Sequence, residues 1–135
     1  MFRELEDGMA VSPQITADDV RAAASLGYGT IICNRPDGEE ANQPSAAEIE
    51  AAAQDAGLSF LALPFAAGGP SQDQVEGLAA ALAAPGKVLA YCRSGTRSAT
   101  LWALARAGEG QDADALIGAA KAAGYDLEAL RPRLR

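Results

Sequence analysis

The sequence predicts a single α/β domain in which a parallel sheet of four or five strands is covered by helices. Short apolar runs alternate with helix-like segments of about ten residues, which is the pattern of βαβ units. These runs are continuously apolar and do not alternate between apolar and polar residues, as expected for strands that are buried on both faces of a sheet. A chain of 135 residues has the length of one domain that can bury its own core.

The elements follow one another with recognisable boundaries. Side chains that suit the N-cap position precede each of four helical segments, and glycine follows three of them. We expect strands at 9–11, 30–33, 58–63 and 87–91, and helices at 16–26, 45–56, 71–83, 98–106 and 112–123.

The domain is expected to span residues 1–135, with its core between about residues 5 and 125. Asp126 would cap a last short turn. The basic tail, residues 131–135, contains Arg131, Arg133 and Arg135 and is expected to be loosely held.

Composition excludes several classes of function. A net charge of −7 argues against a nucleic-acid partner, and no apolar run is long enough to span a membrane. No apolar leader is present near the first residue, so we expect a cytoplasmic protein. The chain has no histidine, which excludes Cys–His and Ser–His catalysis and most transition-metal sites. We expect neither a metal nor a cofactor.

The most informative segment is the cysteine loop, residues 92–98, which reads Cys-Arg-Ser-Gly-Thr-Arg-Ser directly after a buried strand. A cysteine at the start of a helix and between arginines is favoured as the thiolate, which is the nucleophilic form. Backbone N–H groups of such a loop also form a concave anion site. We therefore predict a cysteine-based enzyme for a small anionic substrate; a structural cysteine before an ordinary helix is the alternative.

Each position of the loop has an expected role. Cys92 is the candidate nucleophile, and Arg97 can place two donors on an oxyanion. Gly95 permits a close backbone approach. Ser98 or Thr96 could donate a hydrogen bond to the sulfur, and Ser98 could also cap the helix. The anion-binding loop is thus predicted to comprise Arg93, Ser94, Gly95, Thr96, Arg97 and Ser98, with Arg93 pointing outward to attract anions.

Polar residues also follow the expected strand at 30–33. Because the carboxyl ends of parallel strands meet at one edge of a sheet, these residues should lie near the cysteine loop. Arg35 could add positive charge to the cleft, with Asn34 beside it. Asp37 is a candidate catalytic residue that could orient Arg97 or act as a substitute acid. A simple turn with a surface charge is the alternative for this segment.

Other residues have simpler expected roles. Cys33 could be a redox partner of Cys92, or a small buried residue. Glu39 and Glu40 are expected to be solvated loop charges, and Tyr91 and Trp102 are expected in the core.

The cysteine loop resembles the active loop of rhodanese-type sulfurtransferases. The chain as a whole resembles a bacterial family named for the phosphatase-like domain of beta-lactamase-hydrolase-like proteins. The resemblance covers roughly residues 5–107 and rests on residues 26–32, 34–39, 63–64 and 91–104. It implies a fold similar to that of the protein tyrosine and dual-specificity phosphatases. The family also occurs fused to a metallo-hydrolase domain of a kind that handles persulfides, which hints at sulfur chemistry.

Departures from the phosphatases favour sulfur transfer. Phosphatases of this fold use Cys-x5-Arg, whereas the spacing from Cys92 to Arg97 is Cys-x4-Arg, and Tyr91 stands where they usually have histidine. The segment that would carry their acidic residue, 63–69, has no carboxylate. A sulfurtransferase needs no such acid, because a persulfide on Cys92 passes its outer sulfur to a thiol or to cyanide.

We therefore expect a sulfurtransferase that takes thiosulfate or a persulfide as donor and a thiol as acceptor. A phosphatase that forms a phosphocysteine on Cys92 is the alternative. A module that binds an anion without turnover is the second alternative.

Overall fold

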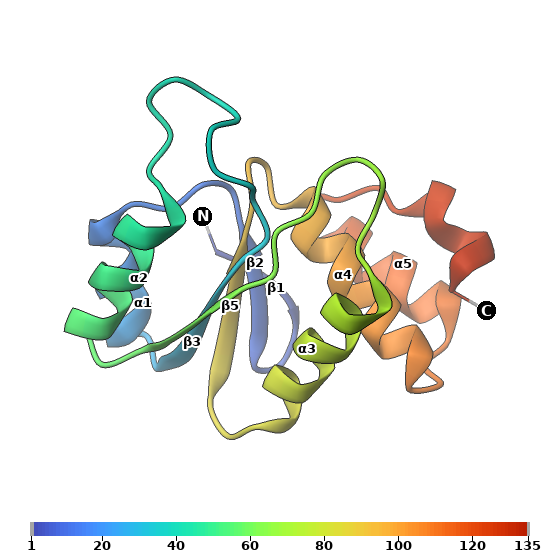
Figure 1. The fold of residues 1–135 in the computed structure, drawn as a ribbon. Helices are drawn as coiled ribbons and strands as arrows, with labels where there is room; N and C mark the ends of the chain where they lie inside the picture. Colours follow the sequence, from blue (N-terminus) through green and yellow to red (C-terminus); the bar gives the residue numbers. More distant parts are fainter. Residues whose placement is uncertain (1, 135) are drawn as a thin grey trace.

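The computed structural model describes residues 2–134, and its centre is a five-stranded sheet with the order β1-β2-β5-β3-β4 (Figure 1). Four neighbouring strands are parallel, and β1 pairs with β2 in antiparallel orientation. The sheet is therefore mixed, and the prediction of a purely parallel sheet is wrong at this edge. The strands are β1 (Arg3–Glu6), β2 (Met9–Ser12), β3 (Tyr28–Cys33), β4 (Ser59–Ala62) and β5 (Lys87–Tyr91).

The edge strand β1 escaped prediction because three of its four residues are polar and only Leu5 is buried. A tight turn joins it to β2, with Gly8 at a φ of 85°. Glu6 fixes the strand to a helix, because its carboxylate accepts hydrogen bonds from Trp102 Nε1 at 2.7 Å and from Arg106 Nε at 2.9 Å. Burial alone would raise the pKa of Glu6, but these hydrogen bonds outweigh it and hold that pKa below its usual value.

Helices cover both faces of the sheet. Figure 1 shows α1 and α2 on one face and α3, α4 and α5 on the other. Each face has its own apolar cluster, and Tyr91 and Trp102 are buried as predicted. The helical elements are α1 (Ala17–Ser25), α2 (Ala46–Asp55), α3 (Gln72–Ala83), α4 (Thr96–Gly108), α5 (Ala113–Ala122) and the short 3₁₀ helix η1 (Glu128–Arg133).

The predicted N-caps are confirmed. Thr16, Ser45, Ser71 and Asp112 each accept a hydrogen bond from the backbone N–H three residues later, at 3.1–3.2 Å. These short polar side chains satisfy N–H groups that the first helical turn leaves unpaired. The local sequence thus fixes where four of the helices begin.

The C-terminal segment makes more contacts with the rest of the domain than predicted. Arg131 in η1 pairs with Glu128 and Asp114, and Leu134 is buried against the α3–α5 face. The prediction of a loosely held tail is therefore wrong at Leu134, whereas Pro132 and Arg133 are exposed and Arg135 lies outside the described residues. Asp126 accepts a hydrogen bond from the Glu128 N–H at 3.0 Å, as predicted for its short turn. No helix within residues 2–134 has both the length and the apolar character needed to cross a membrane.

The register of the central strands sets the position of the site. Cys33 at the end of β3 lies opposite Tyr91 at the end of β5. The Asn34 N–H then donates to the Tyr91 carbonyl at 2.8 Å, and the Cys92 N–H donates to the Ser12 carbonyl at 3.3 Å. The loops that follow β2, β3 and β5 therefore leave the sheet at the same edge, as expected for parallel strands.

Candidate active site

The cysteine loop joins β5 directly to α4. Gly95 is the N-cap of α4 and has a φ of 101°, in the left-handed region that glycine adopts without strain. Its N–H donates to Cys92 Sγ at 3.0 Å. The sulfur thus lies at the N-terminus of a 13-residue helix, where the helix dipole favours negative charge.

The hydrogen bond to the sulfur that was predicted from Ser98 or Thr96 is replaced by other contacts of these two residues. Ser98 Oγ donates to Asn34 Oδ1 at 2.8 Å, and Asn34 Nδ2 donates to the Leu63 carbonyl at 3.0 Å. Ser98 and Asn34 are both fully buried, so they connect the cysteine loop to the ends of β3 and β4. The Thr96 hydroxyl is 3.1 Å from Ser94 Oγ. These hydroxyl groups therefore shape the loop rather than bind the sulfur.

Tyr125 supports the loop from its other side. Its hydroxyl donates to the Ser94 carbonyl at 3.0 Å. A Cβ atom added at Gly95 would lie 2.1 Å from the Tyr125 oxygen. Sequence reasoning missed this residue, because nothing local links position 125 to the cysteine loop.

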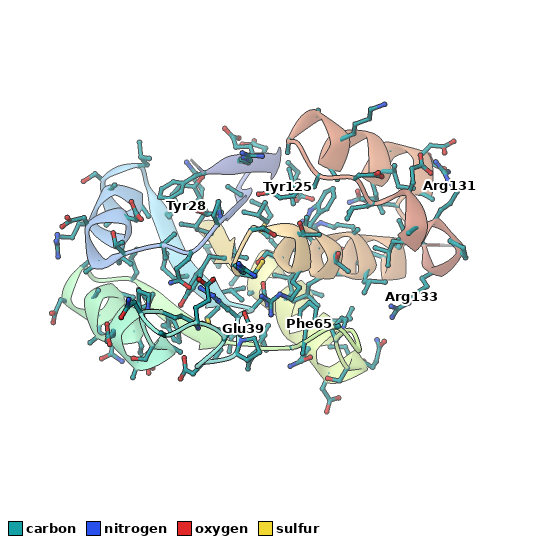
Figure 2. The ribbon with its side chains drawn as sticks, turned by 90° about the horizontal axis from the view of Figure 1, so that it is seen from above. Tyr28, Glu39, Phe65, Tyr125, Arg131 and Arg133 are labelled. Carbon is teal, nitrogen blue, oxygen red and sulfur yellow. The ribbon has the colours of Figure 1, made fainter. Side chains whose placement is uncertain are left out.

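Arg97 lies beside the cysteine, as predicted, but its guanidinium is already paired. Its two terminal nitrogens each donate to one oxygen of Glu39 at 2.8 Å, and Nη1 also donates to the Phe65 carbonyl at 3.2 Å. Figure 2 shows Glu39 and Phe65 side by side, on the loops that follow β3 and β4. The hydrogen bonds to Arg97, assisted by Arg35, lower the pKa of Glu39 from its usual value to about 2. The same pair raises the pKa of Arg97, so both groups stay charged at neutral pH.

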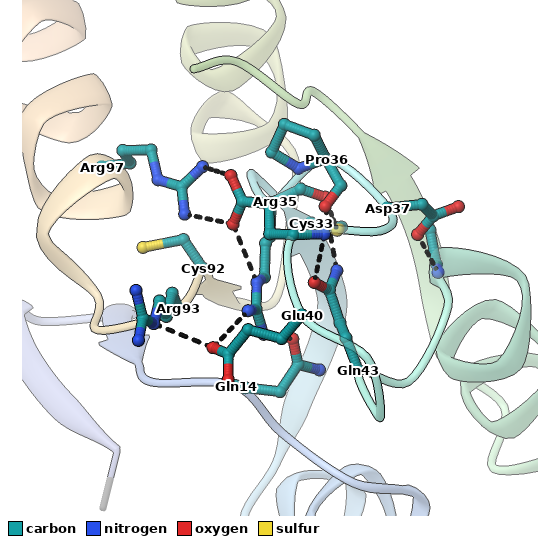
Figure 3. Close-up of polar contacts among 12 residues, drawn as sticks. Gln14, Cys33, Arg35, Pro36, Asp37, Glu40, Gln43, Cys92, Arg93 and Arg97 are labelled. Carbon is teal, nitrogen blue, oxygen red and sulfur yellow. Dashed lines mark hydrogen bonds and ion pairs between the residues drawn. The ribbon is translucent and has the colours of Figure 1, made fainter. Parts of the chain in front are cut away.

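Arg35 is the second arginine of the site and is 3% exposed. It donates to Glu39 Oε1 at 2.9 Å, to Glu40 Oε1 at 2.8 Å and to Gln14 Oε1 at 3.0 Å. Arg93 pairs with the same oxygen of Glu40 at 2.9 Å. Glu39 and Glu40 are exposed loop charges, as predicted, but they also have a role that was not predicted, because together they hold three arginines (Figure 3). A usable signal was their position four and five residues after Arg35, in a loop at the same sheet edge.

Asp37 does not lie where it was predicted. Its carboxylate accepts the Ala46 N–H at 2.8 Å at the start of α2, and Glu39 occupies the position on Arg97 instead. The predicted contact between Asp37 and Arg97 is therefore wrong. The reason is that the loop turns back to α2 at Asp37, so that the carboxylate satisfies a helix N-terminus.

Cys33 is buried and its thiol donates to the Arg35 carbonyl at 3.3 Å. Burial raises the pKa of Cys33, which keeps it a thiol at neutral pH. Both cysteines are free thiols. Within residues 2–134, no three Cys, Asp or Glu side chains are grouped so that they could hold a metal ion.

The chain matches the family model described as "Beta-lactamase hydrolase-like protein, phosphatase-like domain" over residues 1–109. The chain belongs to this family. It is 35% identical over 126 residues to the beta-lactamase hydrolase-like protein of Xylella fastidiosa (strain Temecula1), covering 92% of this chain and 29% of that protein. It is 30% identical over 108 residues to the protein of the same name from Agrobacterium fabrum, covering 79% and 25%. The chain thus spans less than a third of the length of these relatives.

Solved structures of several phosphatases are similar to this phosphatase-like domain. A candidate phosphatase from Neisseria meningitidis is 42% identical, covers 98% of this chain and 94% of its own, and has a TM-score of 0.85. The phosphatase Tk-PTP has a TM-score of 0.74 at 18% identity, covering 98% and 92%. Kinase associated phosphatase has a TM-score of 0.73 at 16% identity, covering 99% and 90%. The last two likenesses show the fold alone, which is that of the protein tyrosine phosphatases.

Proposed function

We propose that the chain is a cysteine-dependent phosphatase that hydrolyses phosphate monoesters through a phosphocysteine on Cys92. The observation that carries the proposal is the strand–loop–helix junction, where the sulfur, the Gly95 N–H at 3.0 Å and the Arg97 side chain belong to one seven-residue loop. The family and the phosphatase fold of its relatives support this reaction over the sulfur transfer expected from the sequence.

The reaction has two steps. The Cys92 thiolate attacks phosphorus, so that the S–P bond forms while the P–O bond to the leaving group breaks. Water then attacks the same phosphorus, and the S–P bond breaks to release inorganic phosphate and the thiolate. The loop N–H groups and Arg97 would stabilise the charge on the phosphoryl oxygens in both steps. An aryl leaving group needs little protonation, which suits a segment 63–69 without a carboxylate.

Sulfur transfer is the second candidate, because two features of the chain favour it. The spacing Cys-x4-Arg has the rhodanese length, and sulfur transfer requires no acid on residues 63–69. In that reaction the thiolate attacks the sulfane sulfur of thiosulfate, an S–S bond forms on Cys92 and sulfite leaves. Cyanide or a thiolate then attacks the outer sulfur and regenerates the thiolate.

A paired assay tests the two candidates. The purified chain is supplied with an aryl phosphate in one reaction and with thiosulfate plus cyanide in the other, beside the variant Cys92→Ser. We expect release of inorganic phosphate that is lost in Cys92→Ser and kept in Cys33→Ser. Thiocyanate formation without phosphate release would overturn the phosphatase proposal in favour of the second candidate.

A further inference from the structure

The arginines of the site are connected by two carboxylates into one continuous chain of ion pairs. The order is Arg97, Glu39, Arg35, Glu40 and Arg93, with donor–acceptor distances of 2.8–2.9 Å at every link (Figure 3). Arg35 is the buried centre, and the arginines at the two ends are the ones that belong to the cysteine loop.

Glu39 occupies the guanidinium of Arg97, which a substrate anion would need as its partner. A carboxylate with both oxygens on the ends of a guanidinium makes the same two-pronged contact that a phosphoryl group makes. Cys92 is 0% exposed in this arrangement, so a substrate reaches the sulfur only when the surrounding side chains move. Glu39 therefore marks the position of an anion beside the nucleophile.

Glu40 marks a second such position on Arg93. The Arg93 side chain is 67% exposed and its described partner is the Glu40 carboxylate, which is itself 51% exposed. Both carboxylates touch the one buried guanidinium of Arg35, so the two anion positions are separated by the width of that group. Because Arg35 contacts both glutamates, it can keep them as partners when Arg97 and Arg93 turn to a ligand.

We propose that Arg93 forms a second anion subsite, and that the substrate is a compact molecule with two anionic groups. The reacting phosphoryl group lies on Arg97 beside Cys92, and a second phosphate or carboxylate lies on Arg93. The identity of the first group rests on the proposed phosphatase function, whereas the second subsite does not.

A cavity beside Arg93 has room for the second anionic group. It has a volume of about 480 Å³ and no aromatic ring, and its lining includes Arg35, Arg93, the Glu40 carboxylate and the polar side chains of Gln14, Asn42 and Gln43. A flat aromatic substrate would find no ring to stack on there. When Glu40 turns away from Arg93, the arginine and amide donors suit a second charged group in its place.

Binding to the full chain carrying Cys92→Ser tests the proposal without turnover. The probes are methylphosphonate, with one anionic group, and phosphonoacetate and methylenediphosphonate, with two, each titrated calorimetrically at the same ionic strength. We expect the two-anion probes to bind about tenfold more tightly than methylphosphonate, and we expect Arg93→Gln to reduce that ratio to about twofold or less.

Arg21→Gln is the matched control, because the Arg21 side chain is 63% exposed and pairs with Asp18 on α1, away from the cysteine loop. It removes the same charge and should leave the ratio unchanged. Glu40→Gln, which frees Arg93, should increase the ratio. An equal affinity for all three probes, or the same loss of ratio in Arg21→Gln, would overturn the second subsite. The phosphatase proposal fails independently, by the absence of phosphate release from the wild-type chain.

Discussion

Two loops at the same edge of the sheet are held in different ways. The cysteine loop is fixed by the buried Ser98–Asn34 hydrogen bond and by a partly buried hydrogen bond from the Tyr125 hydroxyl to the Ser94 carbonyl. The loop after β3, residues 34–45, is held onto it by charged side chains with substantial exposure, Glu39 at 27% and Glu40 at 51%. Packing and hydrogen bonds thus fix the nucleophile. The loop that lies over it is held by ion pairs, which an anion can replace.

The comparison predicts that a change in the fixed loop costs the most. Gly95→Ala places a Cβ atom 2.1 Å from the Tyr125 oxygen and strains a φ of 101°. We expect a loss of roughly 2–4 kcal/mol in the free energy of unfolding, measured in urea, together with loss of activity. Gly110→Ala is the control, because its φ is 94° and nothing lies within 4 Å of the added Cβ. Equal losses in both variants would show that the contact with Tyr125 does not constrain the loop.

A smaller effect is expected where buried charge joins the two loops. Arg35→Met leaves Glu39, Glu40 and Gln14 without their shared donor. Because the carboxylates are partly exposed, we expect a loss of about 1–3 kcal/mol in thermal or urea unfolding. Arg21→Met, at an exposed ion pair, should change stability by less than about 1 kcal/mol. A stability equal to that of the wild type would mean that Arg35 does not hold the loop after β3.

Acid should loosen the loop after β3, residues 34–45, before it loosens the cysteine loop. The folded-state pKa of Glu39 is lowered from 4.5 to about 2, so its stabilising contribution is present above about pH 4.5 and is lost as the pH falls toward 2. Glu39→Gln should therefore remove part of the decline in unfolding free energy between pH 5 and pH 2. Glu50→Gln, on the exposed side of α2, should retain the wild-type slope. Identical slopes in the wild type and Glu39→Gln would contradict the ion-pair account.

The mildest change removes one hydrogen bond from the fixed loop. Tyr125→Phe keeps the ring against Gly95 but deletes the donor to the Ser94 carbonyl. We expect a loss of about 0.5–1.5 kcal/mol in urea unfolding, with the effect on turnover smaller than that of Gly95→Ala. A turnover loss as large as that of Gly95→Ala would assign the hydroxyl a chemical role instead.

What the sequence could predict was local. The strand–loop–helix around Cys92 and four helix starts depend on residues near one another in the chain, and they are confirmed. The antiparallel strand β1 was missed because three of its four residues are polar, and because the contacts of Glu6 with Trp102 and Arg106 join positions far apart in the sequence. The contacts of Glu39, Glu40 and Tyr125 with the cysteine loop were missed because the partners are far apart in the sequence. The separation is 58 residues for Glu39 and Arg97 and 31 residues for Tyr125 and Ser94. Asp37 was misplaced because a carboxylate near a helix start suits either a cap or a site, and only the tertiary structure decides between them.

The most direct test of the phosphocysteine mechanism is the mass of the peptide that contains Cys92, measured during turnover. The wild-type chain is mixed with an aryl phosphate, quenched rapidly in acid and digested. The masses of the peptides that contain Cys92 and Cys33 are then measured by mass spectrometry. The account predicts one added phosphoryl group on the Cys92 peptide and none on the Cys33 peptide. Phosphate release with no adduct on Cys92, or with full activity in Cys92→Ser, would contradict it.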